Sequence, residues 1–148
     1  APLLSGAARP SATPALAAGT CLTAPTVGQL AAGGATSVRL LWAYGTGWYV
    51  YASPAVWDRL VFAGSYSKRF YAFDAATGDV RWTFTANGEI SGSPTVVGRI
   101  VYFATLEGRT YALDALTGRQ VWTYPDGKYS PVVAVSGRLF FVVYGQVC

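Results

Sequence analysis

Residues 112–122 read Ala-Leu-Asp-Ala-Leu-Thr-Gly-Arg-Gln-Val-Trp, and residues 72–82 read Ala-Phe-Asp-Ala-Ala-Thr-Gly-Asp-Val-Arg-Trp. Six of these eleven positions are identical, and the two copies lie 40 residues apart. The same spacing links Trp42 with Trp82 and Trp122. Because a fixed period of roughly 20–50 residues indicates a solenoid, a propeller or an array, the fold is expected to consist of copies of one unit.

Each copy contains about four short runs of the residues that favour β-strands, chiefly Val, Tyr, Phe, Thr and Ile. In the clearest copy we expect strands at Ser93–Val97, Arg99–Thr105, Arg109–Asp114 and Gln120–Tyr124. Turn residues separate these runs, and no segment shows a sustained helical period. Four antiparallel strands in about 40 residues are typical of one blade of a β-propeller, so the sequence predicts an all-β fold.

The Asp-x-x-Thr-Gly segment predicts a rigid corner between the third and fourth strands of each copy. The Asp can accept hydrogen bonds from the backbone N–H groups that follow it, and the Gly can adopt a positive φ at little cost. The Trp four residues after the Gly is expected on the outer strand, where its ring can pack against the corner of the next copy. The predicted structural residues of the repeat are Trp42, Asp74, Thr77, Gly78, Trp82, Asp114, Thr117, Gly118 and Trp122.

The repeated Ala-x-Asp-Ala-x-Thr-Gly-x-x-x-Trp pattern resembles the tryptophan-docking motif of pyrroloquinoline-quinone-like (PQQ-like) β-propellers. The resemblance covers residues 37–148 and implies four-stranded antiparallel blades. Residues 48–84 and 88–124 would then form two complete blades. Residues 37–44 would be the outer strand of one partial blade, and residues 129–148 would be the first half of another.

Two complete and two partial blades do not close a ring, because propellers typically have four to eight blades. Two explanations remain open. Either the sequence is a portion of a longer propeller, or the N-terminal outer strand of one copy joins the C-terminal half blade of a second copy. Residues 1–36, dominated by Ala, Gly, Pro, Ser and Thr, are interpreted as a tail or linker before the blades of residues 37–148.

Composition excludes several classes of function. The 148 residues are 52% hydrophobic and carry a net charge of +4 without a long Lys/Arg run, which argues against nucleic acid as a partner. The longest apolar stretch, Leu139–Tyr144, is far shorter than the roughly 20 residues of a membrane-spanning helix. There is no histidine, which removes the central residue of Ser/His/Asp hydrolysis and of the usual zinc sites.

The chain begins with Ala1-Pro2 instead of Met, which indicates processing such as removal of a signal peptide. We therefore expect an extracytoplasmic protein, whether secreted, periplasmic or at the cell surface. Cys21 and Cys148 are the only cysteines. An intrachain disulfide between them, free or interchain thiols, and lipid attachment at Cys21 are the alternatives considered.

The resemblance also raises the namesake activity of a quinoprotein dehydrogenase. In those enzymes an adjacent Cys-Cys disulfide covers the quinone, and Glu, Asn and Asp side chains hold a calcium ion. This sequence has no Cys-Cys pair, and its one asparagine, Asn87, lies in an Asn-Gly turn. Glu89 and Glu107 are the acids without an assigned turn role, and their spacing does not place them together. We therefore expect no catalytic, cofactor-binding or metal-binding residues in this chain, and no cofactor.

Trp48 lies with Tyr49 and Tyr51 at the entry to the first complete blade, and Trp57 is expected at a turn position that Val97 has in the next repeat. Trp48 and Trp57 are the predicted interface residues, unless they pack on the blades. The function expected is a non-catalytic scaffold that binds other protein chains, of the same or a different kind. One alternative is a portion of a PQQ-dependent quinoprotein dehydrogenase whose cofactor site lies in other blades. Another is the ligand-sensing ectodomain of a receptor.

Overall fold

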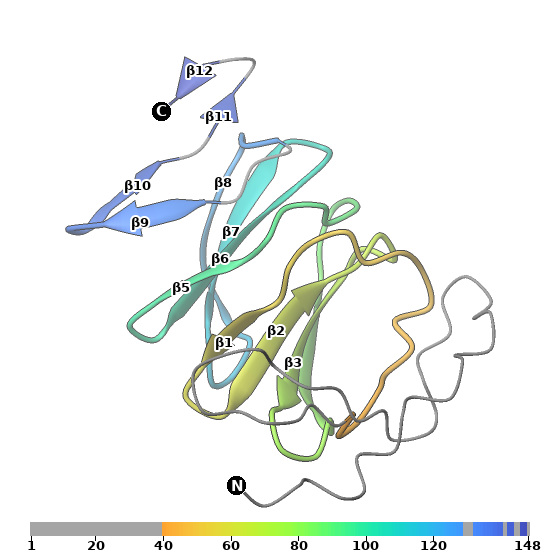
Figure 1. Cartoon of the computed structure of the whole chain (residues 1–148). Coiled ribbons are helices and arrows are strands. Elements are labelled where there is room, and N and C mark those ends of the chain that lie inside the picture. The colour runs from red at the N-terminus through yellow and green to blue at the C-terminus, as the bar shows by residue number, and fades with distance from the viewer. Residues whose placement is uncertain (1–39, 129–131, 141, 144–145, 148) are drawn as a thin grey trace, which may run out of the picture. The chain divides into compact units, whose positions relative to one another are not determined.

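The computed structural model describes residues 40–128, 132–140, 142–143 and 146–147. The chain divides into two compact units, residues 1–45 and Thr46–Cys148. All the described strands belong to the second unit (Figure 1). No described residue belongs to a helix, so none of them forms a helix able to cross a bilayer. The predicted all-β fold class is confirmed.

Two four-stranded antiparallel sheets form the centre of this unit (Figure 1). The first blade runs in the order β1 (Ala55–Trp57), β2 (Leu60–Gly64), β3 (Arg69–Asp74) and β4 (Val80–Thr85). The second blade repeats that order with β5 (Thr95–Val97), β6 (Ile100–Thr105), β7 (Arg109–Asp114) and β8 (Gln120–Tyr124). The predicted bounds of β7 and β8 are confirmed to the residue.

The two blades share an irregularity as well as a strand order. The register between the third and fourth strands shifts at Ala72/Phe73 in the first blade and at Ala112/Leu113 in the second. A bulge of this kind increases the local twist of a sheet. Its recurrence at the same position, 40 residues later, shows that the repeat in the sequence extends to the details of the backbone.

Two short hairpins follow the second blade. One consists of β9 (Val133–Val135) and β10 (Arg138–Phe140), and the other of β11 (Val142–Val143) and β12 (Gln146–Val147). They lie within residues 129–148, where the repeat predicts the first half of another blade. The first strands of successive blades are neighbours, because β1 lies beside β5 and β5 lies beside β9.

The structure corrects three expected strands, one of them by a single residue, since β6 begins at Ile100 and not at Arg99. Residues 40–44, the described part of the expected N-terminal outer strand, have no strand structure, because a strand forms only where a neighbour pairs with its backbone. In the second blade, β5 begins at Thr95 and not at Ser93. Pro94 has no N–H to donate to a ladder, which explains the later start.

Large aromatic side chains form the core between the two blades. Phe70 of β3 stacks on Phe103 of β6, with ring centroids 4.1 Å apart and planes at 8°. Phe84 of β4 meets Phe103 and Tyr111 edge-on at 6.2 and 5.2 Å. The surrounding cluster includes the fully buried Phe62, Ile90, Val101 and Leu113. Aromatic pairs in these geometries contribute about 0.5–1.5 kcal/mol beyond the burial of their area, so the two blades act as one packed body.

Candidate functional site

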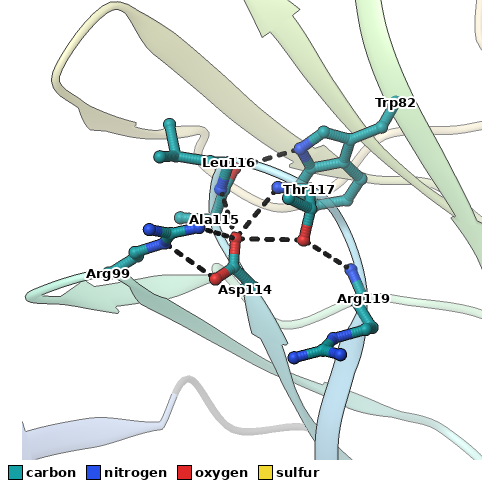
Figure 2. A network of polar contacts seen from close by, with 7 residues as sticks. All are labelled: Trp82, Arg99, Asp114, Ala115, Leu116, Thr117 and Arg119. Atoms are coloured by element: carbon teal, nitrogen blue, oxygen red, sulfur yellow. Dashed lines mark hydrogen bonds and ion pairs between the residues drawn. The ribbon is translucent and has the colours of Figure 1, made fainter.

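The corner between β7 and β8 is organised by one carboxylate (Figure 2). Asp114 Oδ1 accepts hydrogen bonds from the backbone N–H groups of Leu116 and Thr117, both at 3.0 Å, and from the Thr117 hydroxyl at 3.1 Å. Arg99 Nε donates to Asp114 Oδ2 at 2.8 Å. The carbonyl of Asp114 accepts from Gly118 N at 2.8 Å, which closes the turn.

The corner between β3 and β4 has the same backbone hydrogen bonds, but a different arginine pairs with its aspartate. Asp74 Oδ1 accepts from the N–H groups of Ala76 and Thr77 at 2.9 and 3.2 Å, and the Asp74 carbonyl accepts from Gly78 N at 2.9 Å. Here Arg81, on β4, donates to Asp74 Oδ2 at 2.7 Å. The repeated element is therefore the carboxylate with its N–H donors, while the arginine that completes it comes from β4 in the first blade and from the turn before β6 in the second.

Both carboxyl groups ionise more readily than a free aspartate. The Arg81 hydrogen bond, followed by those from Ala76 and Thr77, holds the pKa of Asp74 below its ordinary value of 3.8. Burial works to raise the pKa of Asp114, but the hydrogen bonds from Arg99 and Thr117 more than offset it and lower that pKa. Each corner is thus locked by a carboxylate that stays charged at neutral pH.

Trp82 of the first blade packs on the corner of the second blade (Figure 2). Its indole Nε1 donates to the carbonyl oxygen of Ala115 at 3.0 Å. Gly118 has φ +71°, and a Cβ there would come within 2.6 Å of Cδ2 and Cε3 of the Trp82 ring. The other side of the ring faces Phe62 and Phe70, at centroid distances of 5.8 and 6.0 Å. The tryptophan therefore ties the outer strand of one blade to the turn of the next.

The other two repeat tryptophans lie in different surroundings. Trp122, at the position on β8 that Trp82 has on β4, is 36% exposed, and its ring meets Tyr102 at 5.8 Å. Burial raises the pKa of that tyrosine. Trp42 lies among the described residues of the other compact unit and is half-buried. Among the described tryptophans, Trp82 therefore shows the blade-to-blade contact in full.

The predicted interface residues separate into one exposed and one packed side chain. Trp57, in β1, is half-buried against the core cluster. Trp48 is 63% exposed and meets Tyr49 edge-on at 5.6 Å. The rings continue from Tyr49 to Tyr51 at 5.7 Å and from Tyr51 to Tyr66 at 4.9 Å. We refer to Trp48, Tyr49, Tyr51 and Tyr66 as the aromatic surface.

The backbone below the aromatic surface is held in place. Tyr66 N, in the turn between β2 and β3, donates to the Tyr49 carbonyl at 2.9 Å, and Thr46 Oγ1 donates to the Trp48 carbonyl at the same distance. Tyr49 and Tyr51 are nevertheless 58% and 67% exposed. Tyr66 was not predicted to join these rings, because it lies 15 residues after Tyr51 in the sequence.

The structure also brings together two acids that the sequence left apart. The backbone N–H of Leu106 donates to the Glu89 carbonyl at 2.9 Å, and the Glu107 carboxylate lies against Gly88. A hydrogen bond from its own backbone N–H is the main cause that lowers the pKa of Glu89. In the described part of the chain, no three His, Cys, Asp or Glu residues gather as metal ligands would.

Cys21 and Cys148 both lie outside the described residues, so their pairing stays a prediction. The sequence has no match among curated proteins. A family model described as outer membrane protein assembly factor BamB matches residues 23–147.

Three solved structures show the same fold at low identity. BamB from Moraxella catarrhalis has a TM-score of 0.62 and 22% identity over 76% of this chain, and 36% of its own length is covered. A europium-containing methanol dehydrogenase has a TM-score of 0.60 and 20% identity, with 70% of this chain and 22% of the enzyme covered. Quinohemoprotein alcohol dehydrogenase from Comamonas testosteroni has a TM-score of 0.56 and 21% identity, with 64% of this chain and 17% of the enzyme covered.

This chain spans about a third of the length of that BamB and about a fifth of the length of the two dehydrogenases. At these identities the likeness concerns the fold, which is a β-propeller of four-stranded blades. The repeated corner, the Trp82 contact and the match over residues 23–147 agree with one another. The chain belongs to the PQQ-like β-propeller family whose model is described as outer membrane protein assembly factor BamB.

Proposed function

We propose that this chain is part of a non-catalytic β-propeller scaffold that binds other polypeptides outside the cytoplasm. The observation that carries the proposal is the aromatic surface, in which Trp48, Tyr49 and Tyr51 are each more than half exposed. Their rings contact one another above a backbone that hydrogen bonds already hold. A partner that binds there meets side chains that lose little conformational freedom on binding.

Tryptophan and tyrosine are the side chains that most often dominate protein–protein interfaces. Complete burial of one large apolar side chain contributes about 1.5–3 kcal/mol, and the polar ends of these rings can bond to a partner's backbone. Two or three such rings supply enough free energy to anchor a specific contact. The partners proposed are other protein chains, whether a second copy or a different polypeptide.

The family supports the same class of partner. Its description names an outer membrane protein assembly factor, which is a role in handling other proteins at the cell envelope. A periplasmic or otherwise extracytoplasmic location for this chain agrees with that description.

The alternative is that the chain belongs to a quinoprotein dehydrogenase, since two structural neighbours are dehydrogenases of this fold. The residues present do not fit the quinone site that the family resemblance implies, because the two cysteines are 127 positions apart in sequence and Asn87 is the one asparagine. A dehydrogenase role would thus require residues from other blades. Equilibrium dialysis of the chain against PQQ and Ca²⁺ is expected to show no saturable binding, and saturable binding would favour the enzyme.

The scaffold proposal is tested by quantitative affinity purification from the cells that make the protein. Wild-type protein is compared with a Trp48→Ala/Tyr51→Ala double variant and with Val56→Ala, which truncates an equally exposed side chain outside the aromatic surface. We expect a defined set of proteins to be lost from the double variant and kept by Val56→Ala. Equal recovery with all three forms would reject the aromatic surface as the binding site.

A further inference from the structure

Asn87 and Gly88 lie in the connection from β4 to β5, where the first blade meets the second. Asn87 Oδ1 accepts a hydrogen bond from Thr105 Oγ1 at 2.8 Å and another from Tyr111 Oη at 3.2 Å. The backbone N–H of Asn87 donates to the same Tyr111 oxygen at 3.1 Å. Thr105 and Tyr111 belong to β6 and β7 and are buried, so three hydrogen bonds join Asn87, which is itself exposed, to two buried residues of the second blade.

The residues on either side of Asn87 are also held. Ala86 N donates to the Lys68 carbonyl at 2.8 Å, and Ile90 N donates to the Ser65 carbonyl at 3.2 Å. Gly88 is buried, and a Cβ placed on it would overlap the carboxylate of Glu107. The connection therefore lies in a closely packed position with little freedom to change its backbone.

Asn-Gly is the dipeptide most prone to deamidation, because glycine does not hinder the attack of its nitrogen. The Gly88 nitrogen bonds to Cγ of Asn87, the bond from Cγ to the side-chain nitrogen breaks, and ammonia leaves with the proton of Gly88. A cyclic succinimide remains. Water then opens the ring at one of its two carbonyls, which gives aspartate or isoaspartate at position 87.

We propose that Asn87–Gly88 is a deamidation site that the blade junction keeps unreactive while the two blades are in contact. The attack requires the side-chain carboxamide to rotate until Cγ lies over the Gly88 nitrogen. That rotation breaks the hydrogen bonds from Thr105 and Tyr111 to Oδ1. The reaction therefore follows the opening of the junction.

The product does not fit the closed junction. Isoaspartate adds a methylene group to the backbone next to Gly88, where the Glu107 carboxylate leaves no space. Either product also places a new carboxylate close to the Glu107 carboxylate, which lies against the neighbouring Gly88. Deamidation after an opening event therefore weakens the contact between the two blades. The fraction of chains deamidated at Asn87 then increases with the number of times that the blades have separated.

The test is unambiguous because Asn87 is the one asparagine in the sequence. Intact mass spectrometry follows the exchange of the side-chain NH₂ for OH during incubation at pH 7.5, and peptide mapping separates isoaspartate from aspartate. For the wild-type chain, deamidation is expected to be at least about tenfold slower in buffer than in guanidinium chloride, because one hydrogen bond to Oδ1 corresponds to roughly that factor. Equal rates in the two conditions would overturn the proposal.

Two variants test the junction itself. Tyr111→Phe removes both contacts of the phenol oxygen and is expected to speed deamidation of the folded chain by up to about tenfold. Tyr102→Phe removes a phenol of the same blade that does not contact Asn87 and is expected to keep the wild-type rate. Asn87→Gln serves as the control without the reactive pair. Equal deamidation rates for Tyr111→Phe and Tyr102→Phe would contradict the proposal. If Tyr111→Phe does not fold, the comparison of the wild-type rates in buffer and in guanidinium chloride tests the proposal instead.

Discussion

Gly118→Ala tests whether the contact of Trp82 with the next corner holds the two blades together. The new Cβ would come within 2.6 Å of two atoms of the Trp82 ring, so the ring or the turn has to move. Overpacking of this kind costs about 1–3 kcal/mol. The positive φ of +71° adds about 1–2 kcal/mol for a residue with a side chain. The expected loss of stability is therefore about 2–5 kcal/mol.

Gly98→Ala is the matched control. Gly98 also has a positive φ, +58°, but a Cβ there meets nothing within 4 Å. Its alanine variant carries the backbone cost of about 1–2 kcal/mol alone, so the difference between the two variants isolates the tryptophan contact.

Urea unfolding of wild type, Gly118→Ala and Gly98→Ala, followed by tryptophan fluorescence and far-UV circular dichroism, measures that difference. Gly118→Ala is expected to unfold at a clearly lower urea concentration than Gly98→Ala. Equal midpoints would refute the reasoning, because they would show that the Trp82 ring can leave the corner at no cost.

Three further substitutions extend the account. Trp82→Phe removes the indole N–H that bonds to Ala115 and is expected to lower the free energy of unfolding by about 1–2 kcal/mol in the same urea assay. The lowered pKa of Asp114 adds stability at pH values above the ordinary carboxyl value of 3.8, and this stability is lost as the pH falls below it. Asp114→Asn is therefore expected to flatten the acid side of a stability profile measured from pH 6 to pH 3. Asp58→Gly is expected to raise the thermal midpoint, with a gain of up to about 1 kcal/mol, because Asp58 has φ +53° where the next blade has Gly98.

Local chemistry explains why much of the fold could be predicted. The strand β7 ends at Asp114 and β8 begins at Gln120, as expected, because both bounds depend on the turn between them. The hydrogen bonds of that turn join residues two to four positions apart, which a sequence shows directly.

The remaining features depend on contacts that a sequence does not display. The repeat predicts that the ring of Trp82 packs on the next corner, but the atom that its indole N–H bonds, the carbonyl oxygen of Ala115 33 residues away, depends on the packing of two blades. Glu89 and Glu107 come near each other because the backbone N–H of Leu106 donates to the Glu89 carbonyl, a contact across 17 residues. Residues 40–44 contain good strand formers without strand structure, because pairing and not composition makes a strand.

The central claim, that the aromatic surface binds another polypeptide, is tested most directly by site-specific photocrosslinking in the cells that make the protein. A photoreactive phenylalanine analogue replaces Trp48 in one variant and Val121, an exposed residue of β8, in the other. The account predicts a discrete crosslinked protein, identifiable by mass spectrometry, from position 48 and none of that mass from position 121. The same adducts from both positions, or none from position 48, would contradict it.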